Sequence, residues 1–218
     1  FSSMVFLWVF LPICLIGYYL VKPKFKNVFL LIASLIFYAW GEPRFVFLMV
    51  LSIIVNYIFA ILIEDTPKEK KAFLTLGIVF NLALLGYFKY FNFLIENINL
   101  LFQAEISAKT IVLPIGISFF TFQIMSYLID VYRNPEIKAQ RNIINLGLYI
   151  ALFPQLIAGP IVKYKDIEKE LLVRNVAVED FSYGIKRFVI GLSKKVLLAN
   201  NLAVTVDLIF AQNAGDLS

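Results

Sequence analysis

Long uncharged runs of apolar residues recur along the chain, and they constrain its fold more than any other feature. Residues 45–63 contain no Asp, Glu, Lys or Arg, and an apolar stretch of about 18 residues or more is a candidate transmembrane helix. Hydrophobic residues make up 61% of the 218 residues and charged residues 16%, whereas soluble domains are about half apolar and about a quarter charged. We therefore predict an all-α, polytopic transmembrane protein.

Residues 1–110 are predicted to form four spanning helices, over residues 4–21, 28–40, 45–63 and 72–95. A fifth span is expected over residues 111–129, with Pro114 near its start, where a helix tolerates proline. The sequence shows no internal repeat and no flexible linker. Residues 1–218 are therefore expected to form a single membrane-embedded unit.

Short basic loops set the predicted orientation. Three lysines follow the first span and three more follow the third, and Lys and Arg accumulate in cytoplasmic loops. The amino terminus of this multi-pass protein is therefore expected outside the cytoplasm. The lysines are Lys22, Lys24 and Lys26, then Lys68, Lys70 and Lys71.

Residues 143–162 break this alternation. A full crossing would place the next basic residues outside, against the bias of every earlier loop. Pro154 and Pro160 each leave a carbonyl without its helical partner, and a membrane tolerates such backbone only against protein or in a water-filled cavity. We therefore predict a re-entrant hairpin that dips in and returns. It keeps four basic residues in the cytoplasm: Lys163, Lys165, Lys169 and Arg174.

Residues 178–195 are predicted to form an interfacial, basic amphipathic helix at the inner membrane surface. Glu179 and Asp180 suit its amino end, where negative charge is favoured. Residues 196–210 form a further apolar run, interrupted by Asn200 and Asp207, and the sequence leaves open whether this run spans the membrane. Residues 111–218 are thus expected to supply a spanning helix, the re-entrant hairpin and a basic amphipathic segment.

Broken backbone inside an apolar run is the candidate substrate path. Free carbonyls and a side-chain amide can line a cavity, so we take Pro154, Gln155, Gly159 and Pro160 as candidates for lining this path. Polar groups within spanning helices more often hydrogen-bond to a neighbouring helix than to a ligand. We expect that role for three amides: Asn56, Asn81 and Gln123.

Basic residues along the inner rim are candidates for binding phosphate. They can hold a polyanionic donor through charge-assisted hydrogen bonds, or anchor the protein to anionic lipid at about 1 kcal/mol per cation, and we favour lipid. They lie in short loops and not on a continuous polar face, so no nucleic-acid partner is expected. The candidates are Lys163, Lys165, Lys186, Arg187, Lys194 and Lys195.

Histidine is absent from the 218 residues. This sequence therefore holds no Ser-His or Cys-His nucleophile pair and no histidine metal site. No glycine-rich phosphate loop occurs, and Cys14 has no second cysteine for an internal disulfide. The residues alone predict no catalytic centre, no bound cofactor and no metal.

Three stretches of the sequence combine into a specific signature. The first is LPIGISFFTFQ at 113–123 with DVYR at 130–133, the second is FPQLIAGPIVKY at 153–164, and the third runs from Phe181 to GLSKK at 191–195. Together they resemble the membrane-bound O-acyltransferases, specifically the alginate O-acetyltransferase-like branch. FSSMVFL at 1–7 and FYAW at 37–40 also resemble the amino terminus of that branch, so the resemblance covers essentially the whole sequence.

The resemblance implies a funnel through which an acyl group, for this branch acetyl, passes from a cytosolic thioester donor to a hydroxyl of an extracytoplasmic acceptor. The acceptor would be an exported polysaccharide such as alginate, the donor a substrate resembling acetyl-CoA, and the location a bacterial inner membrane. A periplasmic or membrane partner acyltransferase often completes delivery in this branch.

The same resemblance implies that the general base is a histidine lying beyond Ser218. The sequence is then expected to be the amino-terminal half of such an enzyme and to be inactive alone. Acylation of teichoic acid or peptidoglycan stays open as the reaction. A non-enzymatic transporter or assembly subunit also stays open, because transporters too build sites from broken helices.

Overall fold

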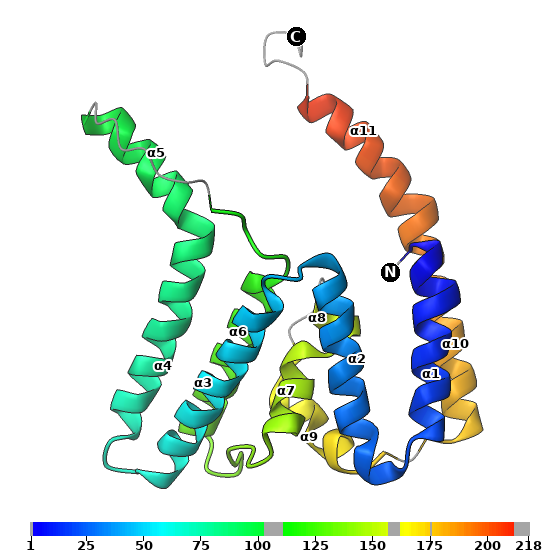
Figure 1. Ribbon diagram of the computed structural model, residues 1–218, viewed down its shortest axis with the longest axis horizontal. Coiled ribbons are helices and arrows are strands. Elements are labelled where there is room, and N and C mark those ends of the chain that lie inside the picture. Colours follow the sequence, from blue (N-terminus) through cyan, green and yellow to red (C-terminus); the bar gives the residue numbers. More distant parts are fainter. Residues whose placement is uncertain (1, 103–110, 157–161, 175, 212–218) are drawn as a thin grey trace. The chain divides into compact units, whose positions relative to one another are not determined.

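The computed structural model describes residues 2–102, 111–156, 162–174 and 176–211, which form helices and their connections with no β-strand among them (Figure 1). This confirms the all-α prediction. The chain divides into two compact units. Unit 1 comprises Phe1–Gly17 and Arg174–Ser218, and unit 2 comprises Tyr18–Val173.

Unit 2 is a bundle in which α4 packs on α3 and α6, and α7 packs on α2, α3 and α6. The short helices α8 and α9 lie against α7. The bounds are η2 Pro23–Phe25, α2 Lys26–Gly41, α3 Val46–Asp65, α4 Lys70–Leu85, η3 Gly86–Tyr90, α5 Phe91–Phe102, α6 Ile117–Arg133, α7 Ile143–Ala151, α8 Phe153–Leu156 and α9 Tyr164–Leu172.

Unit 1 contains the amino-terminal helix and a long carboxyl-terminal helix. The predicted amphipathic segment and the apolar run after it are joined here, because the π-helical segment η4 continues α10 into α11 without a break. The surface position of the amphipathic part stays a prediction. The bounds are η1 Phe6–Phe10, α1 Leu11–Leu20 (whose last residues belong to unit 2), α10 Val178–Ser193, η4 Lys194–Ala199 and α11 Asn200–Phe210.

Four helices in the described part of the chain are long and apolar enough to cross a membrane. A shorter apolar helix, Phe6–Leu20, precedes them. These helices confirm the prediction of a polytopic membrane protein. The four are Pro23–Gly41, Val46–Asp65, Lys70–Phe102 and Val178–Phe210.

Two helix boundaries differ from those read in the sequence. The fourth helix continues through η3 and α5 to Phe102, beyond residue 95. Helix α6 begins at Ile117, not at residue 111, so Pro114 precedes the helix. The reason is Gly116, whose φ of 76° is left-handed and cannot continue a right-handed helix.

Helix α7 forms the centre of unit 2. All of its residues from Asn145 to Ala151 are buried, on every side of the helix. A helix that is apolar all round must be enclosed by protein or membrane, and here the bundle helices α2, α3 and α6 pack on it. The broken segment that follows α7 is therefore held by protein and not by lipid alone.

Asn56 of α3 and Asn81 of α4 form a reciprocal pair across two apolar helices. Asn81 Nδ2 donates to Asn56 Oδ1 at 2.6 Å, and Asn56 Nδ2 donates to Asn81 Oδ1 at 3.3 Å. Both side chains are buried. Gly77, one turn before Asn81, lets α4 lie close to α6, since a Cβ there would lie 2.8 Å from Leu128 Cδ1 of α6. The predicted interhelical role of both asparagines is confirmed.

One end of unit 2 gathers the turn before α2, the turn between α3 and α4, and the loop between α6 and α7. The Arg141 guanidinium donates two hydrogen bonds to Asp65, at 2.6 and 2.9 Å, which raise the arginine pKa. Asn27 Nδ2 donates to Asn145 Oδ1 at 2.8 Å and to the Leu171 carbonyl at 2.7 Å. We call this the basic end, because the lysine-rich turns lie there.

The hairpin prediction is tested by cysteine accessibility in a Cys14→Ser background. Lys165→Cys and Lys68→Cys are expected to react with an impermeant maleimide only after intact cells are permeabilised, because both positions belong to the basic end and positive loops stay inside. Arg44→Cys, in the turn at the other end of α2, is the control that should react from outside. Labelling of position 165 from outside alone would exclude the re-entrant hairpin.

Candidate functional site

The helical path is interrupted between α7 and α8. Leu152 leaves the helical region with ψ of 116°, and Pro154 has no N–H to contribute to a helix. The Phe153 N–H donates to Ser34 Oγ of α2 at 3.2 Å instead of to the Tyr149 carbonyl. An α2 hydroxyl thus takes over the donor that the break released.

The Tyr149 carbonyl, freed by the same break, accepts two side-chain amides. Gln123 Nε2 of α6 donates to it at 2.8 Å, and Gln155 Nε2 of α8 also donates to it. A buried carbonyl without a partner costs about 1–3 kcal/mol, so the two glutamines stabilise the break. Gln123 therefore has the predicted interhelical role. Gln155, a candidate for substrate contact, is a partly exposed side chain anchored on the backbone.

The candidate path residues are divided by the limits of the described structure. Pro154 is exposed and Gln155 half-buried, while Gly159 and Pro160 lie outside the described residues. Leu156 reaches Gly116 at the start of α6, where a Cβ would lie 2.8 Å from the Leu156 carbonyl oxygen.

Beyond the gap, the chain lies against α7 again. The Tyr149 hydroxyl donates to the Val162 carbonyl at 2.8 Å, and α9 ends at the basic end, where the Leu171 carbonyl meets Asn27. The turn of the predicted hairpin falls within residues 157–161, outside the described residues, so the hairpin stays a prediction.

Three buried tyrosines lie near the break between α7 and α8, and nothing in the sequence distinguished them as site residues. The rings of Tyr127, Tyr149 and Tyr164 have centroids 4.9 to 6.2 Å apart. Gln140 joins two of them, since its backbone N–H donates to the Tyr127 hydroxyl and its Nε2 to the Tyr164 hydroxyl, each at 2.8 Å. A tyrosine in an apolar run carries little positional signal, because its ring is at home in a core or at an interface.

Two polar atoms of α6 are buried without a hydrogen-bond partner among the described residues: Thr121 Oγ1 and Asp130 Oδ2. Such groups are uncommon in native structures. Asp130 begins the DVYR motif at the basic end of α6. In the sequence, the sign that Asp130 is unusual was a charged residue within an apolar segment.

The predicted phosphate-binding residues are divided between the two units. Lys163 and Lys165 lie at the amino end of α9 in unit 2, and both are exposed. The other four lie in unit 1 on the helix Val178–Phe210, which has no buried residue. These four are Lys186, Arg187, Lys194 and Lys195.

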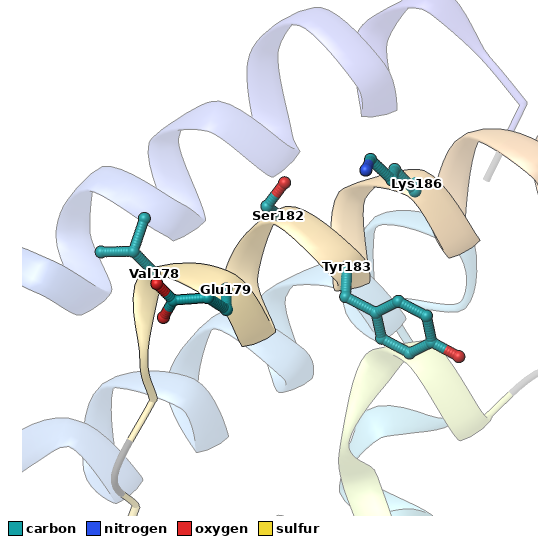
Figure 2. A pocket seen from close by; sticks show the side chains of 5 residues that line it. All are labelled: Val178, Glu179, Ser182, Tyr183 and Lys186. Atoms are coloured by element: carbon teal, nitrogen blue, oxygen red, sulfur yellow. The ribbon is translucent and has the colours of Figure 1, made fainter.

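On α10 an open pocket is lined by one face of the helix. Figure 2 shows Glu179 and Lys186 along this face with Ser182 between them. Arg187 Nη1 donates to the Tyr183 hydroxyl at 3.0 Å, and Lys195 Nζ donates to Ser2 Oγ at 2.9 Å. Because the Glu179 carboxylate lines the same pocket as Lys186, the electrostatic potential in the pocket is mixed rather than purely positive.

Few of the described side chains could take part in catalysis or bind a metal ion. The described residues contain no group of three or more His, Cys, Asp or Glu side chains that could hold a metal ion. Unit 2 contains an interrupted helix whose free carbonyl accepts hydrogen bonds from two side-chain amides. The buried tyrosines and Gly116, which has a left-handed φ, lie beside this interruption. This arrangement can shape and polarise a passage, and it contains no nucleophile paired with a histidine base.

The fold defines a polytopic helical membrane protein with an interrupted apolar segment at its centre. No family model and no solved structure matches the chain. The chain is 42% identical over 218 residues to the probable alginate O-acetylase AlgI of Pseudomonas putida and 41% identical to that of Pseudomonas aeruginosa. These matches cover 97% of this chain, and 45% and 42% of the two relatives.

A second kind of relative is the peptidoglycan O-acetyltransferase of Helicobacter pylori, which is 32% identical over 240 residues and matches 95% of this chain. The chain covers 46% of that protein and thus spans less than half the length of these relatives. The resemblance read from the sequence is confirmed. Over nearly its whole length, the chain is a homologue of part of these alginate O-acetylases and of part of the peptidoglycan O-acetyltransferase.

The shared carbonyl of Tyr149 predicts non-additive substitutions. Gln123→Leu or Gln155→Leu alone is expected to cost about 1 kcal/mol, because the other amide still satisfies the carbonyl. The double variant should cost more than the sum, by about 1–3 kcal/mol. Unfolding in detergent measures this, with Asn97→Leu on the exposed face of α5 as the control. Additive losses would show that the two amides act independently.

Gly116 is expected to be irreplaceable by alanine. Gly116→Ala adds a Cβ at a left-handed φ, which costs about 1–2 kcal/mol, and places it 2.8 Å from the Leu156 carbonyl oxygen. A lower unfolding temperature is expected. Gly86→Ala, where no atom lies within 4 Å of the added Cβ, should be neutral or slightly stabilising. Equal behaviour of the two variants would contradict the close approach of α8 to α6.

Proposed function

We propose that this chain is part of an O-acyltransferase that transfers an acyl group, acetyl by preference, from a cytosolic thioester to a hydroxyl of an extracytoplasmic polysaccharide such as alginate. The observation that carries the proposal is the identity of 40% or more to probable alginate O-acetylases over 97% of the chain. The polytopic fold agrees with a reaction whose two substrates lie on opposite sides of a membrane.

The general base is proposed to be a histidine outside these 218 residues, since none occurs within them. A sugar hydroxyl is a weak nucleophile until a base takes its proton, and histidine titrates near neutral pH. These 218 residues then form the acyl path and bind the substrates, and the proton transfer requires residues elsewhere in the protein.

We assign the helix break at Pro154 and Gln155 to the wall of the acyl path. Its backbone groups are fixed by side chains of α2, α6 and α8, and Pro154 is exposed. Lys163 and Lys165 follow it directly and are exposed. They are suited to the phosphates of a donor that resembles acetyl-CoA and enters from the cytoplasm. Gly159 and Pro160 keep their proposed place in the same wall.

Peptidoglycan is the second candidate acceptor, and the match to the Helicobacter pylori peptidoglycan O-acetyltransferase favours it. Alginate and peptidoglycan both present sugar hydroxyls outside the cytoplasmic membrane, so one membrane scaffold suits both. We place the protein in a bacterial inner membrane with its amino terminus outside. A partner acyltransferase on the outer side would complete delivery to the polymer.

Acyl transfer from a radiolabelled acetyl thioester tests the proposal. Membranes with the 218-residue chain are expected to give no transfer to alginate or peptidoglycan above that of membranes without it. Membranes with the product of the complete reading frame should label one polymer. Replacing each histidine in an apolar context of that product by alanine should abolish the labelling.

Each part of the proposal has its own contrary result. Transfer by the 218-residue chain would contradict the requirement for a histidine. Absence of transfer by the complete product to any sugar polymer, with the protein correctly inserted, would contradict the acyltransferase function and favour a transport or assembly role.

A further inference from the structure

The turn that joins α1 to α2 carries three lysines, Lys22, Lys24 and Lys26, which we call the lysine turn. Lys22 and Lys24 are exposed and Lys26 is half-buried. The turn belongs to the basic end of unit 2, where α2 begins. It therefore presents three ammonium groups where an apolar helix meets the aqueous side.

The sequence around the turn supplies no carboxylate, whereas α9, whose end meets Asn27, carries Glu168 and Glu170. Residues 1–41 contain no Asp or Glu, and none of the three lysines forms an ion pair within the described residues. The turn between α3 and α4 differs: it also has three lysines, but Glu69 lies among them and Glu64 and Asp65 precede them. The two turns have equal cation counts and different local fields.

Aromatic rings hold two of the three ammonium groups. Lys26 Nζ lies 4.3 Å from the ring centroid of Tyr18 and 5.8 Å from that of Tyr19, and Lys24 Nζ lies 4.8 Å from that of Phe25. Cation–π contacts of this length favour an ordered ammonium group. Tyr19 and Phe25 are about half exposed, at 55% and 50%, so the site includes exposed apolar ring surface next to the ammonium groups.

A second apolar surface adjoins the turn from α9. The hydrogen bond from Asn27 Nδ2 to the Leu171 carbonyl, 2.7 Å long, brings the end of α9 to the start of α2. The next two residues, Leu172 and Val173, are 65% and 67% exposed. Cations, aromatic rings and aliphatic side chains are thus gathered in one place at the end of an apolar helix.

We infer that the lysine turn, with Tyr19, Phe25 and Leu172, is a binding site for an anionic phospholipid. The ammonium groups would take the headgroup phosphate, and the rings and Leu172 would take the upper part of the acyl chains. A soluble polyanion matches the cations equally well but gains nothing from the apolar surfaces. The mixed chemistry is what selects lipid as the ligand.

Native mass spectrometry of the intact chain in detergent tests the inference, with cardiolipin, phosphatidylglycerol and phosphatidylcholine of matched acyl chains as probes. The two anionic lipids are expected to be retained over phosphatidylcholine. Near an anionic lipid surface each lysine is worth about a fivefold change in affinity, so K22Q/K24Q/K26Q should lower anionic lipid retention by at least about tenfold. Far-ultraviolet circular dichroism and gel filtration check that the variant is folded.

The matched control is K68Q/K70Q/K71Q, which removes the same charge from the other lysine-rich turn and should leave retention within about twofold. Lys26→Arg keeps the charge and the ring contact and should also retain lipid. An equal loss in both triple variants would overturn the site, since only net charge would matter. Displacement of the bound lipid by inorganic pyrophosphate at comparable concentration would overturn it too, in favour of a soluble polyanion.

Discussion

The carbonyl of Tyr149 is the group on which the centre of unit 2 depends. A helix interrupted inside a membrane leaves backbone groups that lipid cannot satisfy. Here the Phe153 N–H goes to Ser34, and the carbonyl receives the amides of Gln123 and Gln155. Each replacement comes from a different helix. The break in α7–α8 therefore exists only because α2 and α6 are in place.

This dependence gives unit 2 an internal order. The bundle helices α3, α4 and α6 pack on one another, and α7 is enclosed by the helices around it. At the basic end, hydrogen bonds join the elements that surround α7. Asn27 joins α2, α7 and α9 through one amide nitrogen, and Arg141 joins the α6–α7 loop to α3 through Asp65. The broken segment is consequently supported from both directions: by side chains at its middle and by loop contacts at its base.

The sequence was sufficient where a single physical requirement decides the outcome. Apolar run length predicts the spanning helices, and a polar amide in an apolar helix needs a partner, as Asn56, Asn81 and Gln123 illustrate. It was insufficient where the partner is distant. Ser34 and Phe153 are 119 residues apart, and a serine in a helix ordinarily bonds its own preceding turn, as Ser34 also does with Leu30.

Charge was the least informative signal at the candidate site. A lysine at a membrane boundary attracts lipid phosphate and a soluble phosphate alike, so residue type could not distinguish donor binding from anchoring for Lys163 or Lys186. Only the surroundings of each lysine can distinguish these roles, and the structure shows two of them: Glu179 lines the same pocket as Lys186, and Lys163 is exposed. The continuity of Val178–Phe210 was also hidden, because a π-helical stretch that begins at Lys194 and Lys195 shifts the helical phase, and Asn200 and Asp207 interrupt the apolar run after it.

The reciprocal pair of Asn56 and Asn81 bears on how the protein enters the membrane. Each side-chain nitrogen also donates to its own helix, at Ser52 and Gly77, but each side-chain oxygen receives its hydrogen bond from the other asparagine and would lack it alone. Helices α3 and α4 are joined by a tight turn and so can meet while still at the insertion machinery. Their partition into the bilayer is therefore most favourable as a preformed hairpin, which makes biogenesis of the amino-terminal helices pairwise rather than one by one.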